Sequence, residues 1–100
     1  MHTGYLYVRL FVREARTLKD KRQVVKSIID RLKNGFNVAV AEVGSRDDHQ
    51  MAILGIAAVG EDAAGVKTTL DQITDALRKH PIAEFCEARS SVVKFDPENV

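Results

Sequence analysis

The stretch TLKDKRQVVKSIIDRLKNG, residues 17–35, is the longest segment of the chain with a single clear periodicity. Projected at about 100° per residue, its aliphatic side chains fall on one face and most of its basic side chains on a neighbouring stripe. The aliphatic face consists of Val24, Val25, Ile28, Ile29 and Leu32, and the basic stripe of Lys19, Arg22, Lys26 and Lys33. The stretch therefore predicts one amphipathic helix that packs on one side and is exposed on the other.

Both ends of this helix carry recognisable signals. Thr17 followed three residues later by Asp20 resembles a capping box at the start, and Gly35 suggests a left-handed cap at the end. Lys19 and Lys21 stand in the first turn, where the helix dipole disfavours positive charge, so both need a contact that explains them. For Lys21 the alternative is that its aliphatic stem lies along the apolar face while its ammonium reaches solvent.

The rest of the chain supplies four strands and a second helix around this segment. Strands are expected at residues 5–13, 36–43, 51–59 and 84–95, and a helix from the N-cap Asp62 to the His80-Pro81 pair. The seven residues GSRDDHQ between the second and third strands are too few for a crossover helix. The order predicts an α+β, ferredoxin-like β-α-β-β-α-β sandwich, with two helices on one face of a four-stranded antiparallel sheet.

Composition places the chain among single globular domains. It has 100 residues, of which 45% are apolar, and we expect one domain over residues 1–100. No apolar run resembles a secretory signal or a membrane span, and one cysteine, Cys86, excludes an intramolecular disulfide, so a cytoplasmic protein is expected. The net charge of +1 hides an asymmetry, because residues 1–33 hold nine basic and three acidic side chains and the remainder six and eleven.

Four short motifs carry a family resemblance. They are LKDKR at residues 18–22, FNV at 36–38, AEVG at 41–44 and LGIA at 54–57. With them, the chain resembles the YlxP-like family, also called domain of unknown function 503, over nearly its whole length, although Thr17 stands where serine is usual. The resemblance implies a bacterial cytoplasmic protein with the ferredoxin-like fold, often encoded beside translation and ribosome-maturation factors. It implies no activity.

The basic residues of the predicted helix and its approach are the strongest functional lead. Lysine and arginine on one exposed stripe suit the phosphate backbone of structured RNA, such as that of a ribosomal subunit. The expected phosphate contacts are Arg16, Lys19, Lys21, Arg22, Lys26 and Lys33. Two alternatives remain open: a solvated helix face with a Lys26–Asp30 pair, and a surface that meets an acidic protein.

The uncovered face of the sheet is the second lead. Strict alternation in the first strand places Tyr5, Tyr7 and Phe11 opposite the residues that face the helices. These aromatic residues suit either base stacking or a homodimer interface. The third strand is apolar on both faces, which is typical of a strand covered on both sides, and this favours the homodimer.

No residue set predicts catalysis or a bound cofactor. Asp47, Asp48 and His49, with Glu42, are better explained by turn chemistry than by a metal site, and Cys86 by packing as a small buried residue. A small acyl-phosphate or phosphate-ester hydrolase is the remaining alternative, but the loop at residues 13–22 lacks the glycine that would cradle an anion. We therefore expect a protein that is not an enzyme and needs no metal or cofactor.

Overall fold

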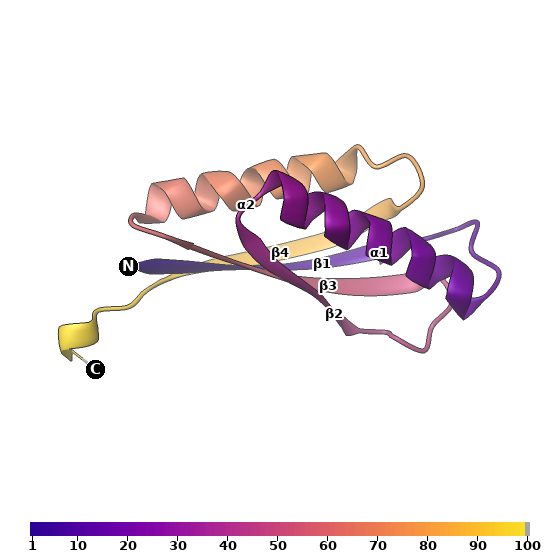
Figure 1. The fold of residues 1–100 in the computed structure, drawn as a ribbon, viewed down its shortest axis with the longest axis horizontal. Helices are drawn as coiled ribbons and strands as arrows, with labels where there is room; N and C mark the ends of the chain where they lie inside the picture. The colour runs from indigo at the N-terminus through magenta and orange to yellow at the C-terminus, as the bar shows by residue number, and fades with distance from the viewer. Residues whose placement is uncertain (100) are drawn as a thin grey trace.

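The computed structural model describes residues 1–99, with six main elements in the predicted order. Strand β1 spans His2–Phe11, helix α1 Leu18–Gly35, β2 Val38–Gly44, β3 Met51–Gly60, α2 Ala63–Arg78 and β4 Glu84–Lys94, followed by a short 3-10 turn, Pro97–Asn99. The strands form one antiparallel sheet in the order β2-β3-β1-β4, and both helices cover the same face (Figure 1). The ferredoxin-like prediction is confirmed.

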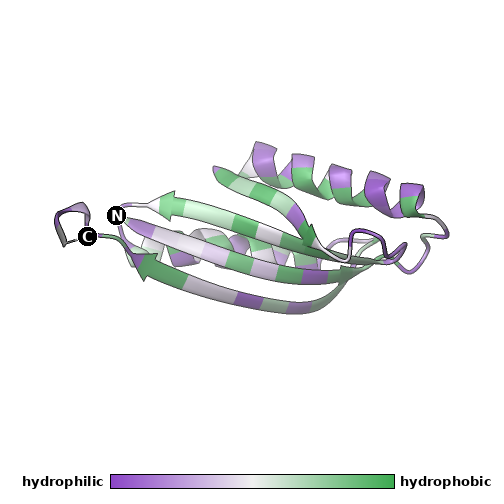
Figure 2. Ribbon diagram, turned by 90° about the horizontal axis from the view of Figure 1, so that it is seen from below, coloured by the Kyte–Doolittle hydropathy of each residue, from purple (hydrophilic) through white to green (hydrophobic). Residues whose placement is uncertain are grey.

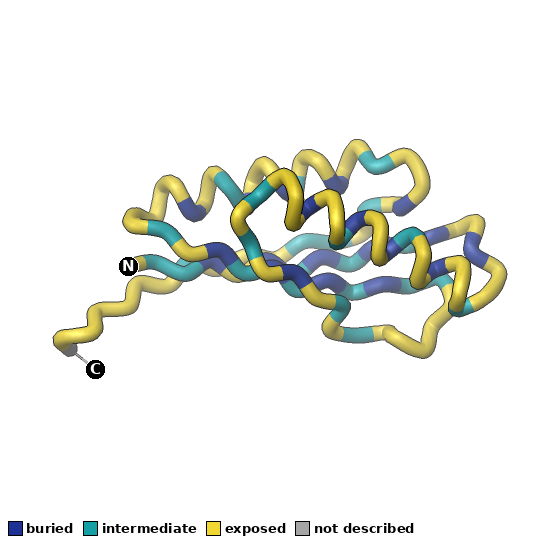
Figure 3. Tube along the Cα trace, viewed as in Figure 1, coloured by how far each residue is buried: buried dark blue, intermediate teal, exposed yellow. Residues whose placement is uncertain are grey.

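The core lies between the helices and the sheet. Buried positions alternate along the central strands (Figure 3). The buried residues of β1 and β3 are even-numbered, and Leu6 lies beside Ile56 and Val8 beside Leu54 beneath the helices. Helix α1 packs mainly over β2, whereas α2 packs over β4 and β1, and both helices contact β3 between them. The two helices therefore divide the sheet between them.

One glycine permits the close approach of α2. A Cβ atom built on Gly4 in β1 would lie 2.4 Å from Cγ1 of Val66 and 2.9 Å from Cδ1 of Leu70, both buried residues of α2. Because real Cβ contacts are never so short, any side chain at this position would force the helix away from the sheet.

The expected left-handed end of α1 is absent. No glycine within residues 1–99 has a positive φ, and the helix ends at Gly35 with the chain turning directly into extended backbone at Phe36. The Phe36 N–H donates to the Leu32 carbonyl at 2.9 Å, which satisfies one of the terminal carbonyls without a left-handed residue. The prediction of a left-handed cap at Gly35 was therefore wrong.

Candidate nucleic-acid interface

The start of α1 is fixed by a full capping box. The Thr17 hydroxyl accepts a hydrogen bond from the Asp20 N–H at 3.1 Å, and Asp20 Oδ2 accepts from the N–H groups of Thr17 at 3.2 Å and Arg16 at 3.0 Å. The hydrogen bond from the Arg16 backbone is the largest cause of the lowered pKa of Asp20. The ionised carboxylate offsets the unfavourable position of Lys19 in the first turn.

Five of the six predicted phosphate contacts lie at the surface. Lys19, Arg22 and Lys33 form no ion pair within residues 1–99. Lys26 pairs with Asp30 at 3.0 Å, but these side chains are 78% and 55% exposed, so the pair is weak. The exposed residues are Arg16, Lys19, Arg22, Lys26 and Lys33, and we call them the basic stripe.

The basic stripe follows the outer flank of α1. At about 1.5 Å per residue, Lys19 and Arg22 are about 5 Å apart along the axis, whereas Lys33 lies about 21 Å from Lys19. On the opposite flank, Arg31 lines a groove shared with the C-terminal end of α2. The unpaired charge is therefore densest at the N-terminal end of α1, on the side away from α2.

Lys21 is not a phosphate contact, and this prediction is corrected by the structure. Its side chain is completely buried, so its ammonium does not reach the surface where a phosphate group would bind. The position lies four residues before Val25 and seven before Ile28, which places it on the buried side of the helix. The alternative in which the ammonium reaches solvent is excluded as well.

The Lys21 ammonium ties α1 to the connection between β2 and β3. Nζ donates to the carbonyl oxygens of Ser45 at 2.8 Å and Met51 at 3.0 Å, and the Arg46 carbonyl is more distant, at 3.5 Å. Oε2 of Glu42 lies 3.1 Å from Nζ in an ion pair, and this buried oxygen accepts no hydrogen bond within residues 1–99. Ser45 adopts a φ of 56°, which turns this connection so that its carbonyls face the lysine. Lys21 is therefore a structural residue with a buried counter-ion.

In the part of the chain that the structure describes, no carboxylate of the acidic second half forms an ion pair with the basic stripe. Asp71 pairs with Lys67 on α2 at 3.0 Å, and Glu87 lies on the uncovered face of the sheet with Arg9 and Arg89. Asp62 caps α2 by accepting from the Gly65 N–H. The asymmetry of charge in the sequence thus persists in space around α1.

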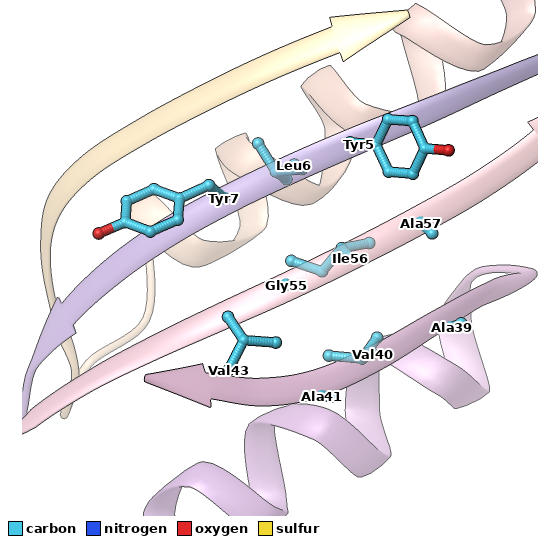
Figure 4. Close-up of a pocket in the computed structure, with 10 residues that line it drawn as sticks. All are labelled: Tyr5, Leu6, Tyr7, Ala39, Val40, Ala41, Val43, Gly55, Ile56 and Ala57. Carbon is cyan, nitrogen blue, oxygen red and sulfur yellow. The ribbon is translucent and has the colours of Figure 1, made fainter. Parts of the chain in front are cut away.

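The uncovered face carries the aromatic residues predicted for it. Tyr5, Tyr7 and Phe11 project from β1 away from the helices, and Tyr5 is 51% exposed. Beside them runs an apolar groove of about 370 Å³ whose wall on the β2 side is Val43 (Figure 4). The pairings of β1 and β3 with their neighbours place the smaller lining residues along its floor: Ala39, Ala41, Gly55 and Ala57.

The remaining candidate residues have local structural partners. Asp48 accepts hydrogen bonds from the N–H groups of Gln50 and Met51, both at 2.8 Å, which lower its pKa and confirm the turn interpretation for this residue. Within residues 1–99, no group of three or more His, Cys, Asp and Glu side chains is arranged to hold a metal ion. Cys86 is exposed and not buried as expected, because it lies at the irregularity between β1 and β4.

Sequence comparisons agree with the resemblance found in the motifs. The family described as "Protein of unknown function (DUF503)" matches residues 3–90. "Uncharacterized protein YlxP" of Bacillus subtilis (strain 168) is 32% identical over 81 residues, which is 81% of this chain and 88% of that protein.

Structural comparisons concern the fold alone. The de novo designed protein Foldit4 superposes with a TM-score of 0.54 at 14% identity and covers 96% of this chain and 100% of its own. The de novo designed protein LFR1 1, with ferredoxin fold, gives a TM-score of 0.53 at 21% identity over 95% of this chain and 88% of its own. Of the helices in residues 1–99, none is long and apolar enough to cross a bilayer.

Proposed function

This chain belongs to the DUF503 family of proteins of unknown function, and from its geometry we propose that it is a cytoplasmic, non-enzymatic accessory factor that binds structured RNA. The binding surface is the basic stripe of α1, and a ribosomal subunit is the proposed target. The observation that carries the proposal is that Lys19, Arg22 and Lys33 are exposed on one flank of one helix and form no ion pair within residues 1–99.

The chemistry of the stripe favours the phosphate backbone over the bases. Its side chains are lysine and arginine, which contact phosphate in any sequence, and no aromatic side chain of α1 stands beside them to stack a base. Recognition of this type reads the shape of a folded RNA and the positions of its phosphates. We therefore expect affinity for structured RNA with little dependence on sequence.

The test is the salt dependence of binding to a structured RNA, measured by fluorescence anisotropy. With about three to four phosphate contacts, the logarithm of the affinity should fall against the logarithm of salt concentration with a slope of roughly −2 to −3. The triple variant Lys19→Glu, Arg22→Glu and Lys26→Glu should lose at least about tenfold in affinity. A flat salt response, or wild-type affinity in the triple variant, would refute the proposal.

A matched control separates the stripe from total charge. The variant with Lys67→Glu, Lys79→Glu and Lys94→Glu changes net charge equally but alters exposed lysines outside α1. It should retain most of the affinity of the wild type. An equal loss in both triple variants would mean that net charge, and not the basic stripe, governs binding.

A surface that binds an acidic protein is the competing function. The same cations would then face carboxylates, and partners captured from a cell extract would persist after nuclease treatment. Under the RNA proposal, nuclease should release them.

A further inference from the structure

The uncovered face of the sheet exposes several large apolar side chains. Four large side chains that point away from the helices are about half exposed or more: Tyr5 51%, Val43 59%, Val59 65% and Val93 48%. All four strands carry apolar residues, which point alternately toward the helices and away from them (Figure 2). A face with this much exposed apolar surface is typical of an interface.

The face has a ridge and a trough that run side by side. The ridge is formed by Tyr5, Tyr7 and Phe11 on the central strand β1. The trough lies over β3 and β2, where Ala57 pairs with Ala39 and Gly55 with Ala41, and Val43 closes its outer side (Figure 4). Tyr5 stands directly beside Ala57, and Tyr7 beside Gly55, across the β1–β3 pairing.

The charges on this face are already paired. Glu87 lies 3.4 Å from Arg9 and 2.8 Å from Arg89, and Glu84 lies 2.8 Å from Arg13. These residues lie on β4, on β1 or just after the end of β1, toward the β4 edge of the sheet. The arginines of this face already pair with its glutamates, so they are not free to bind an acidic protein or a nucleic acid. The surface therefore suits a partner face that is also apolar at its centre.

We propose that a second copy of this chain covers this face, with the two-fold axis parallel to the strands and running between β1 and β3. Such an axis turns the face over and exchanges the positions of β1 and β3. The ridge of each copy then lies over the trough of the other. An axis across the strands would instead place ridge on ridge and leave both troughs empty. The self-complementary pairing of one patch with itself is what a two-fold interface requires.

The same operation orders the interface into a centre and a rim. Tyr5 and Tyr7 lie over Gly55 and Ala57 of the partner subunit, and the edge strand β4 lies over the partner's β2. The pairs of Glu87 with Arg9 and Arg89 are then near the rim, where water reaches them. Aromatic anchors on small residues at the centre are the arrangement that contributes most to binding energy.

The dimensions of the face are close to what a stable dimer needs. The four strands have 10, 7, 10 and 11 residues, and at about 3.3 Å per residue and about 4.8 Å between strands they give a footprint of roughly 600 Å² per copy. Interfaces of ordinary size bury about 800 Å² of accessible surface per partner. The accessible surface of the protruding side chains is larger than this projected area of the strands. The dimer is a four-layer sandwich of helices, sheet, sheet and helices.

The helices remain on the outside of this dimer, so it presents one basic stripe on each outer layer. That consequence rests on the proposed function, but the dimer itself does not.

Sedimentation equilibrium tests the dimer directly. The wild type should be dimeric at about 50 µM, and Ala57→Glu should weaken the dimer at least about a hundredfold because it places a charge in the trough. Gln72→Glu, an exposed position on α2 with the same charge change, should remain dimeric. A wild type that is monomeric at about 1 mM, or an Ala57→Glu variant that dimerises like the wild type, would overturn the proposal.

The axis has its own test, which needs no variant. In a dimer mixed from isotope-labelled and unlabelled copies, filtered nuclear Overhauser effects should connect the Tyr5 and Tyr7 rings with alanine methyl groups at positions 39, 41 or 57 of the other copy. Intermolecular effects confined to contacts between the tyrosine rings would place ridge on ridge and overturn the proposed axis. A wild type that forms the dimer but does not bind RNA would refute the proposed function and leave this inference standing.

Discussion

Lys19 and Lys21 are two residues apart in the same helical turn, yet one is solvent-exposed and the other is completely buried. Among the described residues, the Lys19 side chain has no counter-ion, whereas the Lys21 ammonium contacts Glu42 and two backbone carbonyls. The same residue type is therefore exposed to solvent in one position and structural in the other. What separates them is the position in the helical period and the presence of a carboxylate on β2.

The largest expected difference between these two lysines is in stability. Lys21→Met leaves Glu42 buried without a counter-ion and the Ser45 and Met51 carbonyls without their donor. We expect a loss of about 3–5 kcal/mol in the free energy of unfolding, measured by urea denaturation.

Lys19→Met is the matched control, and it should change the free energy of unfolding by less than about 0.5 kcal/mol. The double variant Lys21→Met with Glu42→Leu should recover part of the loss, because it removes the orphaned charge. Equal and small effects at positions 19 and 21 would contradict the structural role of Lys21.

Among the exposed basic side chains, those without an ion pair should contribute more to RNA affinity than those that already pair with a carboxylate. Arg22→Gln should lower the affinity and reduce the magnitude of the salt slope by about 1, since it removes one phosphate contact. Lys26→Gln should have a smaller effect, because Asp30 already pairs with Lys26. The measurement is anisotropy over a salt series, and a larger effect at Lys26 than at Arg22 would argue against the assigned contacts.

Substitutions at Thr17 test how much the capping box at the N-terminal end of α1 contributes to the free energy of unfolding. Thr17→Ala removes the acceptor for the Asp20 N–H and should cost about 1 kcal/mol in the free energy of unfolding. Thr17→Ser keeps the acceptor and should be close to the wild type. If both variants were equally destabilised, the methyl group of Thr17 and not its hydroxyl would be responsible.

The smallest expected effect concerns pH. The pKa of Asp20 is lower in the folded chain than its ordinary value of 3.8, mainly because of the hydrogen bond from the Arg16 N–H. Its contribution to stability is therefore present above that value and lost as pH falls through the lower, folded pKa. Asp20→Asn should flatten the acid side of the stability curve in denaturation series from about pH 5 to about pH 3. An unchanged curve would mean that Asp20 does not contribute.

The regular elements were predictable because local patterns agree with the tertiary structure. The alternation of β1, the aliphatic face of α1 and the short connection after β2 were enough for the ferredoxin-like order, and the motifs were enough for the family. The helix caps at Thr17 and Asp62 were also readable, because capping is a local interaction.

The role of Lys21 was not predicted, although one signal was present. Its spacing of four from Val25 and seven from Ile28 placed it on the buried face, while its charge suggested the surface. Lys21 is buried, as its spacing indicates, because its ammonium finds partners that are distant in the sequence. Glu42 on β2 supplies the counter-ion, and the β2–β3 connection supplies carbonyl acceptors. Long-range partners of this kind do not appear in a local period. The exposure of Cys86 has the same origin, in an irregular strand pairing.

Binding to isolated small and large ribosomal subunits at two salt concentrations is the most direct test of RNA recognition by the basic stripe. We expect the wild type to bind one subunit at low salt and to be released at high salt, and the variant with Lys19→Glu, Arg22→Glu and Lys26→Glu to bind neither. Absence of binding by the wild type at low salt, where electrostatic attraction is greatest, would contradict the proposed ribosomal target.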